Sequence, residues 1–143
     1  MITRTGSARY QGMGKDGRGW VSTQSGVLKD QAYGFNTRFE DGAGTNPEEL
    51  IAAAHASCFT MALSFALARE GISEGTLETE ARVKLDKEGD GFKISRSDLT
   101  LSANVALDEA RLRELAEDAK KNCPVSKLLN AEMTLEVKAQ QPA

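Results

Sequence analysis

The sequence predicts an α+β protein with a mainly antiparallel sheet, a long buried central helix and a second helix. Three observations predict this fold class. Apolar and polar residues alternate in the segments 77–85 and 99–105, which is typical of half-buried strands. A long apolar run, 50–68, directly follows a helix start. Strand-like segments come in groups rather than in strict alternation with helices, which favours antiparallel pairing. The 143 residues fit a single domain, 1–143.

The first third of the chain is strand-like. Residues 3–10, 19–24 and 33–39 are rich in Thr, Val and Tyr and are separated by glycines. The first connection, 12–17, also matches the G-x-G-x-x-G dinucleotide pattern. A strand follows it, whereas a dinucleotide site needs a helix whose N-terminus binds the pyrophosphate. We therefore interpret these glycines as a turn.

A long helix is predicted to follow. Asn46 can cap it, Pro47 suits its first position, and Glu49 comes three residues after the cap. The helix should run to about residue 70, where Gly71 ends it. Beyond its first turn it is apolar on almost every side, so we expect it to be buried in the middle of the structure.

The second half contains two strands, a helix, a short helical turn and a last strand. The strands at 77–85 and 99–105 are joined by a hairpin turn. Apolar residues of the second strand occupy even positions at Phe92 and Ile94 but odd positions at Leu99 and Leu101. A bulge or bend near 95–98 is therefore needed to keep them on one buried face. We expect the remaining elements to be a helix capped by Asp108 and ending near residue 121, a helical turn after Pro124, and a strand at 133–137.

Composition excludes several classes of function. Lys and Arg number 18 and Asp and Glu number 21, so the formal net charge of −3 argues against nucleic-acid binding. Two cysteines and one histidine cannot build a Cys/His-rich zinc site or a disulfide framework, and we expect no metal. No apolar signal-peptide segment follows Arg4, so we expect a cytoplasmic protein with no membrane association. Thiols are mostly reduced in that compartment.

The two cysteines and the single histidine are the chemically unusual side chains. Cys58 lies within the apolar helix, where a free cysteine is often a small buried hydrophobe; polar neighbours favour a reactive group instead. Cys123 precedes Pro124, so we expect Cys123 to be the N-cap of the following helical turn. The helix dipole favours the thiolate at that position, and the alternative is a neutral cysteine that only caps the turn. If the two cysteines meet in the fold, one can be oxidised and the other can resolve it as a disulfide. His55 is either a base or a structural polar residue, and we favour the second.

Two stretches and one short motif resemble a known family. The run Tyr33–Phe39 and the run Gly44–Phe59 closely resemble the OsmC/Ohr family, and Cys123-Pro124-Val125-Ser126 matches its second cysteine motif. The resemblance covers essentially the whole chain. The chain is similar to the OsmC (osmotically inducible protein C) branch rather than the Ohr branch, because Arg38 lies in the Asn-Thr-Arg-Phe segment just before the long helix.

The resemblance implies a thiol-dependent peroxidase that reduces organic hydroperoxides, and hydrogen peroxide less well. It implies that Cys58 is the peroxidatic cysteine and Cys123 the resolving one, so that a Cys58 sulfenic acid gives a Cys58–Cys123 disulfide. Arg38 would be the active-site arginine and Glu48 the carboxylate that holds it. Members of the family are intertwined homodimers without a metal or organic cofactor, and an external thiol or dithiol must reduce the disulfide.

Residue chemistry is consistent with these roles. A thiolate is the nucleophile toward a peroxide, and a nearby guanidinium raises the thiolate fraction. Glu48 and Cys58 are ten residues apart on the predicted helix, which is about 15 Å of rise and about 80° of rotation. Either the long Arg38 side chain bridges much of that gap, or Arg38 and Glu48 serve Cys58 of the partner subunit. We favour the second, because a partner helix would cover the spare apolar face.

Two other hypotheses use the same residues without turnover. The first is a peroxide sensor or thiol-regulated binding module that uses the cysteine pair. The second is a stress-protective dimer in which Cys58 is inert. Consumption of cumene hydroperoxide with a dithiol separates the enzyme from both.

Overall fold

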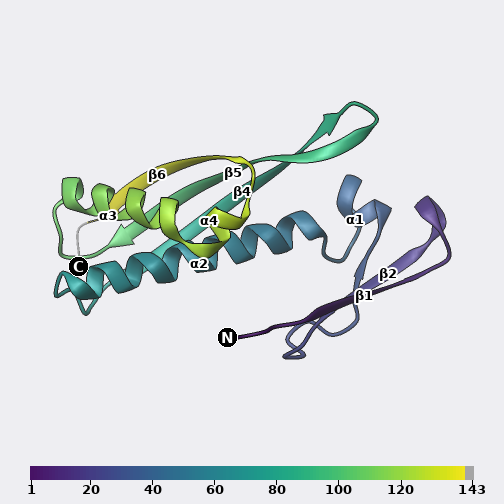
Figure 1. Ribbon diagram of the computed structural model, residues 1–143, viewed down its shortest axis with the longest axis horizontal. Coiled ribbons are helices and arrows are strands. Elements are labelled where there is room, and N and C mark those ends of the chain that lie inside the picture. Colours follow the sequence, from purple (N-terminus) through teal and green to yellow (C-terminus); the bar gives the residue numbers. More distant parts are fainter. Residues whose placement is uncertain (141–143) are drawn as a thin grey trace. The chain divides into compact units, whose positions relative to one another are not determined.

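The computed structural model describes residues 1–140. The chain forms two compact units, Met1–Leu50 and the residues from Ile51 onward. In chain order the elements are β1 (Gly6–Gln11), the 3₁₀ helix η1 (Gly14–Asp16), β2 (Arg18–Thr23), β3 (Gln31–Tyr33), α1 (Phe35–Phe39), α2 (Pro47–Arg69), β4 (Thr76–Glu88), β5 (Gly91–Asn104), α3 (Glu109–Asn122), α4 (Pro124–Leu128) and β6 (Glu132–Gln140) (Figure 1). The strands form two three-stranded sheets rather than one, and three of the four strand pairs are antiparallel.

The first unit is built on the antiparallel sheet β1-β2-β3. The expected strand at 33–39 is wrong: β3 ends at Tyr33, and Phe35–Phe39 forms the short helix α1. The physical reason is a local hydrogen-bonded turn. The Thr37 hydroxyl accepts from the Gly34 N–H at 2.8 Å and donates to the Gly34 carbonyl at 3.0 Å, which closes the first helical turn.

The predicted start and end of the long helix are confirmed. The Asn46 side chain accepts a hydrogen bond from the Glu49 N–H at 2.8 Å, and Pro47 is the first residue of α2. Just before the cap, Gly44 has a φ of +132°, and a Cβ there would lie 2.3 Å from the Ala32 carbonyl oxygen, so this position requires glycine. Beyond α2, Gly71 has a φ of +84°.

The expectation that α2 is buried on almost every side is wrong for the single chain. One face is buried and contains Phe59, Leu63 and Leu67, while Met61 and Phe65 are 63% and 60% exposed. The sheet and helix α3 of the second unit cover only one side of α2, which leaves an apolar face open. Among the described residues, α2 is also the one helix long and apolar enough to cross a membrane, a test that core helices of soluble proteins pass as well.

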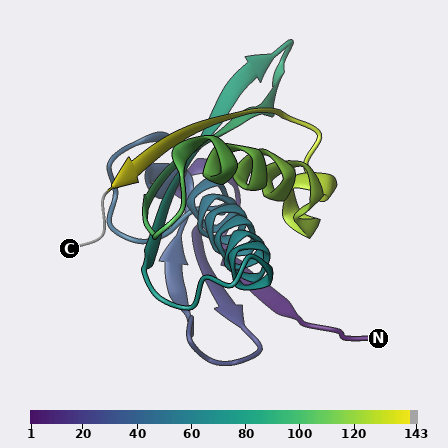
Figure 2. The ribbon, with the colours of Figure 1, turned by 90° about the vertical axis from the view of Figure 1, so that its left-hand side faces the viewer.

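The second unit is built on the sheet β4-β5-β6 (Figures 1 and 2). β4 and β5 form the expected antiparallel hairpin, and the predicted bulge is confirmed: Lys84 faces Arg96 and Leu85 faces Ile94, which leaves Ser95 as the extra residue. The last strand, β6, pairs with β5 in parallel. Helix α3 lies between them in the chain and provides the crossover that a parallel pair needs.

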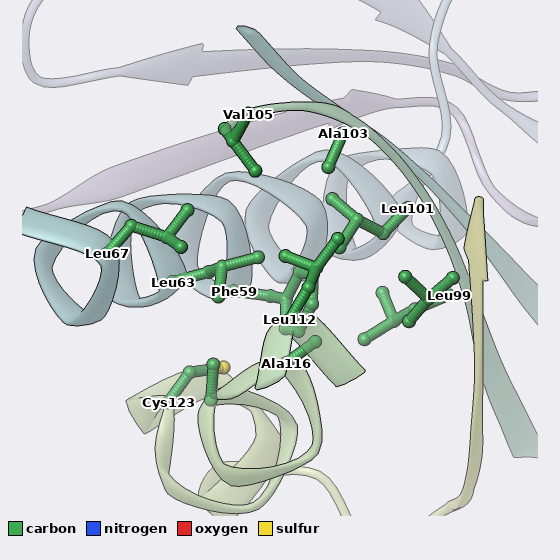
Figure 3. Packing of buried hydrophobic residues seen from close by; sticks show 12 residues of the cluster. Phe59, Leu63, Leu67, Leu99, Leu101, Ala103, Val105, Leu112, Ala116 and Cys123 are labelled. Atoms are coloured by element: carbon green, nitrogen blue, oxygen red, sulfur yellow. The ribbon is translucent and has the colours of Figure 1, made fainter. Parts of the chain in front are cut away.

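The core of the second unit lies between one face of this sheet and the helices α2 and α3 (Figure 3). Figure 2 shows α3 next to α2, which is seen almost end-on. The core consists of alternate residues of β5, one residue of β6 and the facing stripes of the two helices, with contributions from the segments that follow β5 and α3: Phe59, Leu63, Leu67, Leu99, Leu101, Ala103, Val105, Leu112, Ala116, Ala119, Cys123 and Val137. The predicted cap of α3 is confirmed, because the Asp108 side chain accepts from the Arg111 N–H at 2.9 Å.

The opposite, polar face of the sheet contains a carboxylate that joins β5 to β6. Asp98 accepts two hydrogen bonds from the Arg96 guanidinium, at 3.0 and 3.1 Å, and one from the Thr134 hydroxyl at 2.6 Å. These bonds stabilise the charged carboxylate and lower the pKa of Asp98 to about 2, with the Arg96 bonds as the largest cause. The parallel register places Thr134 directly beside Asp98.

We predict that Asp98→Asn lowers the free energy of unfolding by about 1–2 kcal/mol at pH 7. The contribution of a carboxylate with a lowered pKa is present above its unfolded pKa, near 3.9, and is lost as the pH falls toward 2. Urea unfolding of wild type and Asp98→Asn at pH 7 and pH 3 measures this contribution. The difference in the free energy of unfolding between the two proteins should be smaller at pH 3. Glu80→Gln is the matched control, because its pair with Arg82 is largely exposed. Equal stability of Asp98→Asn and wild type at pH 7 contradicts this role.

Candidate active site

Arg38 and Glu48 form a two-point ion pair in the first unit. Arg38 Nε donates to Glu48 Oε1 and Arg38 Nη2 donates to Oε2, each at 3.0 Å. Helix α1 presents the guanidinium, and the first turn of α2 presents the carboxylate, whose side chain is only 12% exposed. A guanidinium has five N–H donors, so three remain for another acceptor. The pair can therefore hold Arg38 in one orientation while it binds a second anion.

A cavity of about 500 Å³ opens beside this pair within the first unit. Arg38 is part of its wall, and Lys15 stands next to Phe35 with its Nζ 5.2 Å from the ring centroid. Tyr10 and Tyr33 meet edge to face with ring centroids 6.1 Å apart. The rest of the wall is largely aromatic or apolar, from Tyr10, Met13, Tyr33, Phe35, Phe39 and Pro47. An apolar wall with one guanidinium suits a ligand that has an organic body and a polar end.

The two cysteines meet in the second unit. Both are free thiols, and Cys123 is a close enough neighbour of the Cys58 side chain to raise the pKa of Cys58. Cys58, on α2, is half-buried and also lies beside the backbone N–H of Val125, in α4. Burial raises the pKa of the Cys58 thiol, the Val125 N–H opposes this rise, and the contact with Cys123 adds to it. Within its own unit Cys58 is therefore held as a thiol, and a nearby cation is needed to favour the thiolate.

Cys123 is the N-cap of α4, as the position of Pro124 predicted. Its Sγ accepts a hydrogen bond from the Ser126 backbone N–H at 3.4 Å and lies 3.1 Å from the Ser126 hydroxyl. Its side chain is 1% exposed and belongs to the core cluster (Figure 3). The sulfur thus faces the interior, toward Cys58, rather than solvent.

His55 is fully buried, and both of its ring nitrogens have a partner. Nδ1 lies 2.6 Å from the Ser97 hydroxyl, and Nε2 lies 2.8 Å from the Ser126 hydroxyl. Burial lowers the pKa of His55, so the imidazole is neutral near pH 7. A neutral imidazole has one N–H donor and one acceptor nitrogen, and each can be satisfied by one of the two hydroxyls.

The sequence identified the Arg38–Glu48 pair, the two cysteines and His55, but missed Lys15, two serines and most of the cavity wall. Ser97 occupies an inward position of β5, in the same alternating series as Leu99 and Leu101. A polar residue in an apolar series is a signal for a buried partner. Ser126 follows Cys123 by three residues, which is the spacing of a capping contact. Arg38 and Glu48 belong to the first unit and the cysteines to the second, and the assignment of all four to one site stays a prediction.

Within residues 1–140, no group of three or more His, Cys, Asp and Glu side chains is arranged to hold a metal ion. The chemistry that the described side chains offer is that of two thiols, an imidazole and a guanidinium.

Known proteins are similar to this chain over most of its length. The peroxiredoxin OsmC of Escherichia coli strain K12 is 49% identical over 138 residues, which cover 94% of this chain and 95% of that protein. The organic hydroperoxide resistance protein OhrB of Bacillus subtilis strain 168 is 38% identical over 125 residues, 84% of this chain and 89% of that protein. The crystal structure of Bacillus subtilis OhrB superimposes with a TM-score of 0.69 at 31% identity and covers 97% of this chain and 98% of that one.

The structural match to OhrB covers almost the whole chain. Residues 40–138 match the OsmC family model, described as OsmC-like protein. Together with the sequence identities, this match establishes that the chain belongs to the OsmC family.

Proposed function

We propose that the protein is a cysteine-based peroxidase that reduces organic hydroperoxides with an external thiol or dithiol. One observation carries the proposal: the side chains of Cys58 and Cys123 are neighbours in the fold, although 65 positions separate them in the chain. Two free thiols in contact can form a disulfide after one of them is oxidised. The names of the relatives, a peroxiredoxin and an organic hydroperoxide resistance protein, support the same activity.

The reaction begins at Cys58. Its thiolate attacks the terminal oxygen of the hydroperoxide, the O–O bond breaks, and the alcohol leaves, so that Cys58 becomes a sulfenic acid. Cys123 then attacks the Cys58 sulfur, which gives the disulfide and water. Cys58 rather than Cys123 is the first nucleophile because Cys58 is half-buried, whereas Cys123 is 1% exposed.

Arg38 supplies the positive charge that Cys58 lacks in its own unit. Burial raises the pKa of Cys58, so its thiolate needs a cation to form at neutral pH. Arg38, held by Glu48, has free donors for the sulfur and for the peroxide oxygen. The aromatic cavity beside Arg38 favours alkyl or aryl hydroperoxides over hydrogen peroxide, because an organic group gains from leaving water.

The working unit is a homodimer of single-domain chains in the cytoplasm. The open face of α2, with Met61 and Phe65, is apolar and suits a second copy of the same face across a two-fold axis. Arg38 and Glu48 then serve Cys58 of the partner subunit. The net charge of −3 argues against a nucleic-acid partner.

Mass spectrometry after one equivalent of cumene hydroperoxide tests the proposal. The expected product is a chain that has lost two hydrogens and contains a Cys58–Cys123 disulfide in its peptide map. With a dithiol present, the protein should consume hydroperoxide over many turnovers. Cys123→Ser is the matched control: it cannot form the bond, so Cys58 should proceed to sulfinic acid under excess peroxide.

Each other outcome has a definite meaning. Disulfide formation without dithiol-supported turnover indicates a peroxide sensor and contradicts the enzyme. No modification of Cys58 under excess peroxide leaves only the stress-protective dimer. Faster turnover of hydrogen peroxide than of cumene hydroperoxide contradicts the substrate preference.

A further inference from the structure

A continuous chain of hydrogen-bonding groups links Cys123 to the buried histidine. Cys123 Sγ lies 3.1 Å from the Ser126 hydroxyl, which lies 2.8 Å from His55 Nε2. On the far side of the ring, Nδ1 lies 2.6 Å from the Ser97 hydroxyl. The four groups come from the α3–α4 junction, α4, α2 and β5, and all four side chains are buried. Long-range folding, rather than local sequence, places them in line.

We propose that this Cys123–Ser126–His55 chain is a proton relay that activates the resolving cysteine. The inference rests on the proposed function, because it concerns the second step of that reaction. His55 acts through Ser126 and is a positioning residue that holds the proton; Ser126 is the group that touches the reacting sulfur. The relay explains why a buried imidazole is placed at this position with a hydroxyl on each side.

The direction of transfer follows from donor and acceptor roles. When Nδ1–H donates to Ser97, Nε2 accepts from the Ser126 O–H, and the Ser126 oxygen accepts from the Cys123 S–H. A proton can then pass from the sulfur to the Ser126 oxygen while the Ser126 proton passes to Nε2. The result is a Cys123 thiolate that accepts from the Ser126 hydroxyl and backbone N–H, with Ser97 bound to Nδ1 throughout.

The step balances. The thiolate of Cys123 attacks the sulfur of the Cys58 sulfenic acid, an S–S bond forms, and the S–O bond breaks. Hydroxide leaves with the S–O electron pair, and the proton held by His55 neutralises it, so the products are the disulfide and one water. The peroxide consumed in the first step is the oxidant. Burial disfavours the charged imidazole, so His55 holds this proton only briefly and returns it.

The charged residues next to Ser97 and Ser126 in the chain lie away from the relay. Arg96 and Asp98 flank Ser97 on β5 but point to the opposite face of the sheet, where they pair with each other. Lys127, next to Ser126, is exposed. Cys58 is a titratable neighbour of the relay, next to Cys123.

The first test separates the two steps in Ser126→Ala. This variant removes the hydroxyl but keeps the backbone N–H that caps Cys123. After one equivalent of cumene hydroperoxide, formation of the Cys58 sulfenic acid, trapped with dimedone, should be unchanged, while disulfide closure should slow by about 10- to 100-fold. Ser126→Thr, which keeps a hydroxyl, should restore closure. Ser57→Ala is the matched control, because that hydroxyl binds only its own helix, at the Ala54 carbonyl.

Further variants show whether the groups act as a unit. His55→Gln should slow closure as Ser126→Ala does, and the double variant should be no slower than either single variant. Closure at the wild-type rate in Ser126→Ala, or an equal loss in both steps, overturns the relay. Failure of the wild type to form the sulfenic acid or the disulfide overturns the proposed function instead, so the two failures are distinct.

A second test needs no variant. His55 is the only histidine of the chain, so the imidazole ¹⁵N signals of untagged, labelled wild-type protein belong to one residue. The relay requires the neutral ring to carry its proton on Nδ1, with Nε2 as the acceptor. A resting ring protonated on Nε2 offers no acceptor for the thiol proton and contradicts the proposal.

Discussion

Replacing Cys58 by serine is expected to abolish hydroperoxide turnover, with a loss of at least about 10³-fold in kcat/KM. A serine hydroxyl is not ionised near neutral pH and cannot form the sulfenic acid on which the second step depends. The measurement is steady-state consumption of cumene hydroperoxide with a dithiol. Because Cys58 is half-buried and serine is nearly the same size, the fold should survive.

Consumption of the first equivalent of hydroperoxide distinguishes Cys58→Ser from Cys123→Ser. That variant keeps the first nucleophile, so it should consume a first equivalent of hydroperoxide before it stalls or is over-oxidised. Cys58→Ser should consume none. Full turnover in Cys58→Ser would defeat the mechanism, and a first-equivalent reaction in Cys58→Ser would place the nucleophile at Cys123.

Replacing Arg38 by methionine is expected to reduce kcat/KM by about 10²- to 10³-fold, the range found when one donor to a developing charge is removed. Burial already raises the pKa of Cys58, so losing the guanidinium lowers the thiolate fraction further and moves the activity to higher pH. Rates of Cys58 alkylation across pH 6–10 measure the same effect without substrate. Arg38→Lys should have a kcat/KM between those of wild type and Arg38→Met, because an ammonium keeps the charge but cannot make the paired hydrogen bonds of a planar guanidinium.

Arg82→Met is the matched control for charge. Arg82 also forms an ion pair, with Glu80, but both partners are largely exposed and lie on the polar face of β4. This variant should keep wild-type activity and wild-type alkylation. Equal activity of Arg38→Met and wild type would remove Arg38 from the proposed site.

Mixed dimers test whether Arg38 serves its own chain or the other one. When Cys58→Ser and Arg38→Met chains are expressed together, half of the dimers contain one chain of each kind. If Arg38 serves the partner subunit, each mixed dimer regains one of two sites, and about one quarter of the wild-type activity returns. If Arg38 serves its own chain, every site lacks one group and no activity returns. The second result would sink the cross-subunit arrangement.

The features that the sequence predicted correctly depend on short-range interactions along the chain. The Asn46 and Asp108 caps, Pro47, and the bulge at Ser95 depend on residues within a few positions of each other, and all appear in the structure. Where local patterns were ambiguous, the prediction was wrong. The segment 33–39 alternates like a strand, yet the Thr37 hydroxyl turns part of it into α1.

Interactions between residues close together in the chain therefore determined most of the elements and their caps. The sequence also contains two cysteines, an arginine and a glutamate in an order that resembles the OsmC/Ohr family. Tertiary structure alone decided that Cys58 and Cys123 are neighbours, that β6 pairs in parallel, and that α2 leaves an apolar face open. It also gave His55 its two partners, which lie 42 and 71 positions away. A cap or turn is stabilised by atoms that the chain holds close together in any conformation. A buried contact exists only once the whole core has formed, so the sequence can signal that a position such as Ser97 needs a partner but not which distant residue that partner is.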